Sequence, residues 1–155
     1  MHLMALDKNS GFLTIDDFPV HLLSTDEFVG SDFYKRFSPF RKIGEFIYVL
    51  EDVIWNEHCF SVEFRPAIFS FSPCVYLMSQ DGAFYSSLTD WNKRADLNLL
   101  SEESKVLVSW VENILSLDGR GNMPSGTRWV LPWGSIAVQS NTRTFDCGIY
   151  ISWEC

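Results

Sequence analysis

Residues 43–65 read IGEFIYVLEDVIWNEHCFSVEFR, and this stretch decides the fold class. Apolar side chains fall on both parities of residues 43–55, which is typical of an interior strand that is covered on both faces. Residues 59–65 alternate instead, as in a half-buried antiparallel strand with an apolar face of Phe60, Val62 and Phe64. Because the turn at 56–58 is too short for a crossover, the two strands must be antiparallel neighbours.

Further strand patterns lie on both sides of this hairpin. Residues 12–15 predict a short first strand, and residues 67–79 predict an extended segment interrupted by prolines. Gln80-Asp81-Gly82 then predicts a hairpin turn into 83–85, because both Asp and Gly tolerate a positive φ. Near the carboxyl end, residues 128–138 and 143–153 predict a last hairpin.

Two segments have the pattern of amphipathic helices. Ser24 can cap the first, with Glu27 three residues later, and this helix must stop before Pro39. Residues 101–117 form the second, whose apolar residues recur at helical spacing: Leu107, Trp110, Val111, Ile114 and Leu115. Gly119 follows in the position expected of a helix end.

These elements define an expected fold. The chain has 155 residues without an internal repeat or a linker-like stretch, which indicates a single domain spanning residues 1–155. Strands joined by short turns together with two amphipathic helices predict the α+β class. We expect an antiparallel sheet of about six or seven strands packed against the two helices.

The charge balance narrows the range of partners. Twenty acidic against twelve basic residues give a formal net charge of −8, which repels phosphate backbones and favours a cationic partner. The basic and aromatic segment 33–42 leaves two interpretations open. It could stack bases and bind phosphates, or it could be a helix end whose rings pack inside the protein. The overall charge disfavours nucleic acid.

The sequence also predicts where the protein resides. The first residues lack a basic segment followed by a long apolar run, so no secretory signal is expected. No apolar run reaches the roughly 18 residues that a membrane span needs. We therefore expect a cytoplasmic protein that does not enter a membrane. Its four cysteines are interpreted as thiols.

Motifs for catalysis or metal binding do not emerge from the sequence. The Gly-rich loop 118–127 has the glycine spacing of a phosphate-binding loop, but Thr127 stands where a lysine is required. We interpret this loop as a connection. Histidines and cysteines show no metal-ligand spacing, so neither a metal nor another cofactor is expected. The sequence therefore favours a protein that is not an enzyme, although it does not decide the question.

Aromatic residues supply the functional hypothesis. They make up 15% of the chain, and several lie in polar surroundings where an amphipathic ring suggests a binding surface. The candidate binding residues are Trp91, Trp129, Trp133, Asp146 and Tyr150. Our leading hypothesis is an acidic, non-enzymatic binding protein that docks a protein partner on this surface, in the manner of an immunity protein or an adaptor, or that associates with itself.

The alternative is a small-molecule-binding domain. Antiparallel sheets covered by helices often enclose an apolar pocket, and the surplus rings could line one for an apolar or cationic ligand. A cavity of a few hundred Å³ walled by Trp and Tyr would favour this alternative, whereas an exposed apolar patch would favour a protein partner. An enzyme would need a cleft where Asp146, Tyr150, His58 or a thiol converge.

Overall fold

The protein is mostly sheet. The computed structural model describes residues 1–69, 71–80, 97–123, 126–141 and 146–154. Within these ranges eleven strands form one mixed sheet, and a single helix exceeds six residues. The predicted α+β fold, with six or seven strands packed against two helices, is therefore wrong. The predicted turn at 81–82 and strand at 83–85 lie outside the described residues.

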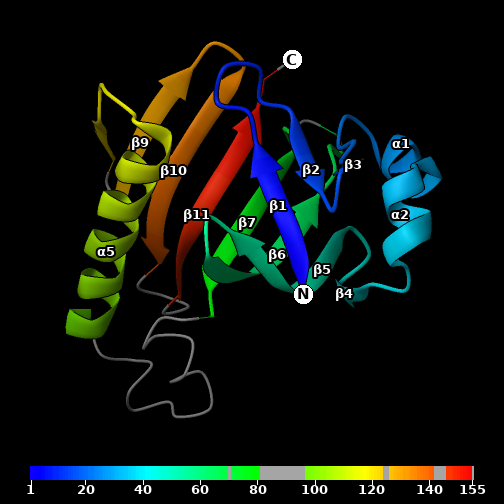
Figure 1. The fold of residues 1–155 in the computed structure, drawn as a ribbon, viewed down its shortest axis with the longest axis horizontal. Helices are drawn as coiled ribbons and strands as arrows, with labels where there is room; N and C mark the ends of the chain where they lie inside the picture. Colours follow the sequence, from blue (N-terminus) through cyan, green and yellow to red (C-terminus); the bar gives the residue numbers. More distant parts are fainter. Residues whose placement is uncertain (70, 81–96, 124–125, 142–145, 155) are drawn as a thin grey trace.

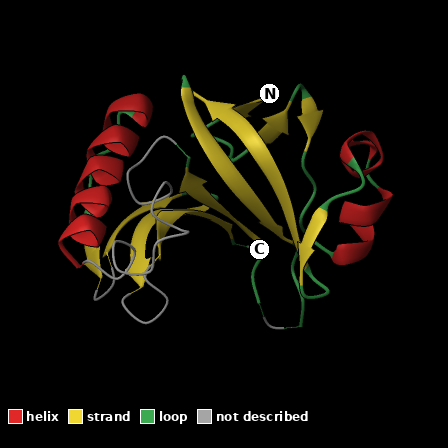
Figure 2. Cartoon of the chain, turned by 90° about the horizontal axis from the view of Figure 1, so that it is seen from below, coloured by secondary structure: helices red, strands yellow, loops and turns green. Residues whose placement is uncertain are grey.

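The strands form one long sheet, and helices lie at its two ends (Figures 1 and 2). The helices are α1 (Thr25–Gly30), α2 (Asp32–Phe37) and α5 (Leu97–Leu115). The strands are β1 (His2–Leu6), β2 (Leu13–Ile15), β3 (Phe18–Pro19), β4 (Arg41–Ile43), β5 (Ile47–Trp55), β6 (His58–Arg65), β7 (Cys74–Ser79), β8 (Gly121–Met123), β9 (Gly126–Leu131), β10 (Gly134–Asn141) and β11 (Asp146–Trp153). Their spatial order is β3-β2-β1-β5-β6-β7-β11-β10-β9-β8, and β4 pairs with β5 beside β1. β1 and β5 are parallel, whereas the other pairs are antiparallel.

The central hairpin predicted from residues 43–65 is confirmed by the pairing of β5 with β6. Its turn contains only Asn56 and Glu57, both at positive φ, as a two-residue hairpin turn requires. The first strand of this hairpin, β5, begins at Ile47 and not at residue 43 as predicted. The chain reverses at Gly44 (φ +66°), and residues 41–43 form the separate strand β4.

The predicted first helix is broken in two by Ser31. Ser24 caps α1 by accepting the Glu27 N–H at 3.0 Å, as predicted. Ser31 then ends α1 and caps α2: its hydroxyl donates to the Phe28 carbonyl at 2.7 Å and accepts the Tyr34 N–H at 3.2 Å. A serine hydroxyl competes well with the helical backbone for these groups, so the segment forms two six-residue helices in place of one.

Extra strands arise where the sequence pattern is short. β1 has one buried side chain, Met4, and therefore shows little alternation. Residues 128–138 do not form one strand, because a turn at 132–133 divides them between β9 and β10. β8 occupies part of the loop 118–127 and pairs with β9. Such additional strands bring the sheet to eleven within the described residues.

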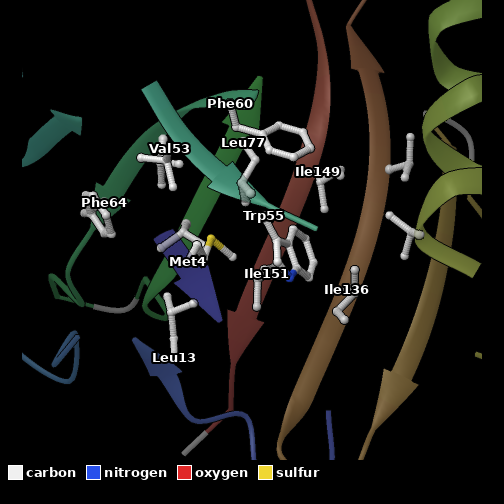
Figure 3. Close-up of a cluster of buried hydrophobic side chains, with 14 of the residues drawn as sticks. Met4, Leu13, Val53, Trp55, Phe60, Phe64, Leu77, Ile136, Ile149 and Ile151 are labelled. Carbon is white, nitrogen blue, oxygen red and sulfur yellow. The ribbon is translucent and has the colours of Figure 1, made fainter. Parts of the chain in front are cut away.

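The core lies on one side of the central strands. A cross-strand row runs through five strands and places buried side chains directly opposite one another: Phe64, Val75, Ile151, Ile136 and Trp129. Figure 3 shows Phe64, Ile151 and Ile136 of this row in one buried cluster with side chains of β1, β2 and β5. Fully burying one such side chain stabilises the fold by about 1.5–3 kcal/mol.

Helices close the core at its two ends. The stripe of α5 that was predicted to face the core includes Leu107 and Val111, which are fully buried, and α5 packs on β10 and β11. At the other end Phe28 of α1 and Phe33 of α2 pack on Phe64, with ring centroids 6.0 and 5.1 Å away. The two halves of the core are therefore one continuous cluster.

The loop between β1 and β2 ties three distant elements together. The indole N–H of Trp133 donates to the Lys8 carbonyl and that of Trp153 to the Gly11 carbonyl, each at 2.7 Å. The Lys8 ammonium donates to the Leu115 carbonyl at the end of α5, also at 2.7 Å. The loop thus links the amino-terminal strands to the helix and to the carboxyl-terminal hairpin.

Gly11 tests the importance of this loop. Its φ of +76° and the Trp133 ring, which would lie 2.5 Å from an added Cβ, both exclude a side chain. Gly119 is a matched control, because it shares a positive φ of +74° but has open space around it. We expect Gly119→Ala to lower the free energy of unfolding by about 1 kcal/mol, and Gly11→Ala by a further 1–3 kcal/mol or so, in urea denaturation. Equal losses would contradict this packing.

A carboxylate holds the amino terminus against the β2–β3 turn. Asp16 accepts the Leu3 N–H at 2.7 Å and lies 3.1 Å from the His2 ring nitrogen. Partial burial raises the pKa of the Asp16 carboxyl, but the Leu3 N–H and the His2 ring outweigh it and hold the pKa below its ordinary value of 3.8. The ionised carboxylate is therefore the form that the folded chain prefers.

Acid titration tests this contact. Because the folded-state pKa lies below the unfolded one, Asp16 stabilises the fold in full above about pH 4, and the contribution is lost as the pH falls through the folded-state pKa. Asp16→Asn should flatten the dependence of unfolding free energy on pH below about pH 4, relative to the parent. Asp17→Asn, in the same turn, is the control. A parent-like acid slope in Asp16→Asn would refute the assignment.

Candidate functional site

The candidate site lies on the sheet face opposite the core, which we call the outer face. Directly across the strands from one another stand Glu63, Tyr76, Tyr150, Ala137 and Arg128. They alternate with the buried row described above, so the pleat places them on the other side of the sheet. The buried side chains of α5 belong to the core cluster, and that helix leaves this face to the strands.

Arg65 is the centre of the outer face. Its guanidinium carbon lies 5.4 Å from the ring centroid of Tyr76 and 5.5 Å from that of Tyr150, and the two ring centroids are 4.5 Å apart. Its Nη2 donates to Glu63 at 2.8 Å. A planar guanidinium can stack on rings and pair with a carboxylate at once, which a lysine cannot do.

A glycine allows the two tyrosines to meet. A Cβ on Gly148 would lie 2.6 Å from the Tyr76 ring and 2.4 Å from the Leu77 carbonyl oxygen. The Tyr76 ring therefore lies over the bare backbone of Gly148, and its hydroxyl donates to Asp146 at 3.4 Å. The result is a polar and aromatic row from Arg65 to Asp146.

The two phenols and the thiol of this row are held in their neutral forms. Burial raises the pKa of the Tyr76 and Tyr150 phenols, and the positive charge of Arg65 offsets this only in part for Tyr150. Burial also raises the pKa of the Cys74 thiol beside Arg65. Since a thiol reacts as the thiolate, Cys74 is not activated. Tyr76 is only 3% exposed, so the accessible hydrogen-bonding and stacking groups of the row are those of Arg65, Tyr150 and Asp146.

Two neighbouring hollows lie on this side of the protein. A polar hollow of about 480 Å³ lies over β9, β10 and β11, and its lining includes Arg128, Ser135, Gln139, Tyr150 and Ser152. An apolar hollow of about 370 Å³ is lined by Phe46, Ile47, Arg65, Phe69, Phe71 and Cys74, among others. Ser72 lines both. Together they form a groove with an apolar and a polar end, which we call the outer groove.

The apolar end carries two exposed phenylalanines. Phe69 is 96% exposed and Phe71 is 74% exposed, both on the connection between β6 and β7. Phe69 has a φ of +52°, where glycine or asparagine would be less strained. The Phe71 N–H donates to the Ile68 carbonyl at 2.8 Å and closes the turn. Backbone strain of this kind clusters at functional sites, so the turn is a candidate for a functional role.

The structure brings some of the predicted site residues together. Asp146 and Tyr150 both contact Tyr76 in the row. Trp129 lies in the core at 1% exposure, so its ring has no surface to offer. Trp133 lies elsewhere, beside Trp153 at a centroid distance of 6.0 Å. Trp91 lies outside the described residues.

Sequence reasoning missed most of the outer groove. Glu63 and Arg65 were assigned to the polar face of their strand, and that alternation was the signal for them. Tyr76 was not singled out, because its contacts come from a strand about 70 residues away. The Phe-Ser-Phe run at 69–71, set between two prolines, was an unused signal for an exposed turn.

The two loop segments weighed in the sequence have other roles. The rings of segment 33–42 pack on the core, and Lys35 and Arg36 lie in the last turn of α2, as the helix-end interpretation expects. In the loop 118–127, Arg120 pairs with Glu112 of α5. Segment 33–42 does not line the outer groove, whereas Met123 of the loop 118–127 lines its polar end.

One serine–histidine pair has the geometry of a nucleophile with its base. The His58 Nε2 lies 2.6 Å from the Ser79 hydroxyl. Ser79 is only 2% exposed, however, and a nucleophile must be reached by its substrate. We interpret the bond as a buried polar link between β6 and β7. Within the described ranges, no group of three or more His, Cys, Asp or Glu side chains could hold a metal ion.

Comparisons with known proteins identify no family for this chain. No protein-family model, curated protein or solved structure matches the chain. None of the described helices is both long enough and apolar enough to span a membrane. The functional argument therefore depends on the geometry of the site.

Double-mutant cycles test whether Arg65 organises the outer face. Arg65 and Glu63 keep only 32% and 17% of their side-chain surface exposed, whereas the similar pair Arg41–Glu51 keeps 60% and 39%. Arg65→Ala should lower the free energy of unfolding by about 2 kcal/mol, since it uncovers two rings and leaves Glu63 unpaired. Its coupling to Glu63→Gln should be about 1–2 kcal/mol, against less than about 0.5 kcal/mol for Arg41→Ala with Glu51→Gln. Equal coupling in the two cycles would refute the central role of Arg65.

Proposed function

We propose that the protein is a non-enzymatic binding protein that holds a segment of a partner protein in the outer groove. The observation that carries the proposal is the exposed pair Phe69 and Phe71 on a closed, strained turn. The two rings are the apolar anchor, and the row from Arg65 to Asp146 continues the contact surface.

The anchor follows from the energetics of exposed rings. Covering one large apolar side chain contributes about 1.5–3 kcal/mol, and a few central aromatic residues commonly dominate an interface. The Phe71–Ile68 hydrogen bond closes the backbone that carries the two rings, so binding loses less backbone conformational entropy.

The rest of the groove has the composition of an interface. Tyrosine, phenylalanine and arginine are enriched at protein interfaces, and the groove offers Tyr150, Phe46 and Arg65 at its centre and apolar end. The polar end supplies the hydroxyls of Ser135 and Ser152 and the amide of Gln139, which can bond the backbone of an extended segment.

Charge favours a basic partner. With a net charge of −8, the protein repels other acidic chains and attracts basic ones over distances of about a Debye length. This argues for a partner of another kind over self-association, which would bring two acidic copies together. We further propose that binding takes place in the cytoplasm, which the thiols of Cys74 and Cys147 support, since neither forms a disulfide.

The test uses the phenylalanine anchor. A display library of random linear peptides is selected against the protein, and the affinity of the enriched peptides is measured by calorimetry. We expect enriched peptides with an aromatic and a basic residue, and a loss of at least tenfold in affinity for Phe69→Ser/Phe71→Ser, because the burial of two rings is lost.

Val106→Ser is the matched control, since Val106 is 57% exposed on α5 away from the groove. It should leave peptide affinity unchanged. Sedimentation of the wild-type protein over a range of concentrations measures self-association in the same buffers. Peptides that bind the double serine variant as well as the wild type, or dimers that dissociate only in that variant, would overturn the proposal of a separate partner in the outer groove.

A further inference from the structure

A second cavity lies beside the polar end of the outer groove, and Glu154 lines both. It has a volume of about 310 Å³ and is lined by residues of the β1–β2 loop, of the segment 20–23 and of the carboxyl-terminal strand. Its walls are mostly apolar and aromatic: Phe12, Leu13, Val20, Leu22, Leu23, Pro73, Trp133 and Trp153. We call it the tryptophan pocket. Its volume lies at the lower end of the range of about 300–1,000 Å³ for ligand pockets.

The two tryptophan rings are fixed in place. Both indole N–H groups are used by the carbonyls of Lys8 and Gly11, each at 2.7 Å, so they are not available to a ligand. The ring faces are therefore what the tryptophans offer. Phe12 is 55% exposed and Leu23 is 61% exposed, so apolar surface is also accessible around the pocket.

The charged side chains at the pocket are Glu154, which lines it, and Arg128, which contacts Glu154; His21 also lines the pocket. Among the described residues that line it, Glu154 is the only acidic side chain, and none is lysine or arginine. Glu154 keeps 66% of its side chain exposed, and its contact with Arg128 is long, at 3.5 Å. Its carboxylate is thus weakly paired and accessible to a cation.

We infer that the tryptophan pocket binds a small organic cation, such as a quaternary ammonium compound. Tryptophan has the most favourable ring for a cation, and a quaternary ammonium group needs apolar surface and a negative charge but no hydrogen-bond acceptor. The pocket supplies ring faces, apolar walls and the Glu154 carboxylate. The pocket adjoins the polar end of the outer groove, because Glu154 lines both, but its apolar and aromatic walls are separate from the groove. The inference does not depend on the function proposed for the groove.

The experiment compares choline with its neutral isostere 3,3-dimethyl-1-butanol. Both are titrated into ¹⁵N-labelled full-length protein while the indole N–H resonances are followed. We expect choline to shift the signals of Trp133 and Trp153, and the neutral alcohol to bind about fivefold more weakly or worse, since a cation over an aromatic ring contributes about 1 kcal/mol. Added salt should weaken the binding of choline but not that of the neutral alcohol.

Two surface substitutions should change the affinity for choline in opposite directions. Glu154→Gln keeps the size of the side chain but removes its charge, and should weaken choline binding about two- to fivefold. Arg128→Gln removes the cation that competes for Glu154, and should strengthen it. Glu112→Gln, from the distant Glu112–Arg120 pair, should have no effect. Phe69→Ser/Phe71→Ser should also leave choline binding unchanged, which separates this site from the outer groove.

The inference is overturned by any of three results. Choline could leave both indole signals unmoved at saturating concentration. The neutral isostere could bind as tightly as choline, which would mean that the pocket selects shape without charge. Glu154→Gln and Arg128→Gln could change the affinity in the same direction or not at all.

Discussion

The alternation of side chains along the sheet is the constraint on which the structure depends. One parity of β6, β7, β11, β10 and β9 is sealed in a continuous core, and the other parity is thereby committed to the outer face. Because the register of each strand is set by the burial of residues such as Phe64 and Ile151, a slip of one residue would expose the core row and bury Arg65 and Tyr150. The position of the candidate site is therefore a consequence of the packing of the core, not a separate requirement.

The parts of the fold that could be predicted are those with strong local patterns. The hairpin of residues 43–65 and the long helix have many apolar residues at a regular spacing, so burial and propensity agree. The extra strands are short and depend on pairing partners that lie far away in the sequence: β1 pairs with β5, about fifty residues later. The break at Ser31 was not predicted, because a serine within a helical pattern is ambiguous until its hydroxyl has a partner.

The candidate site, like the fold, could be predicted from the sequence only in part. Strand alternation was enough to put Asp146 and Tyr150 on one face, and the structure keeps them there. It could not show that Tyr76 lies between them, since that contact depends on the pairing of β7 with β11 and on the absence of a side chain at Gly148. Trp129 shows the opposite limit: polar residues precede it, which suggested a surface position, but its own position in the pleat faces the core.

The pairing of β7 with β11 connects the two halves of the sheet, and we call it the joint. It bears on the order in which the chain folds. On one side of it stand the strands of residues 2–79, and on the other those of residues 121–153, so each half is built largely from segments that are near one another in sequence. The joint itself brings together residues about 70 positions apart, and closing so long a loop carries an entropic penalty that is repaid only when the core row is complete. The two halves should therefore gain structure early during folding, and the row of Arg65, Tyr76 and Tyr150, which straddles the joint, should assemble in the final step.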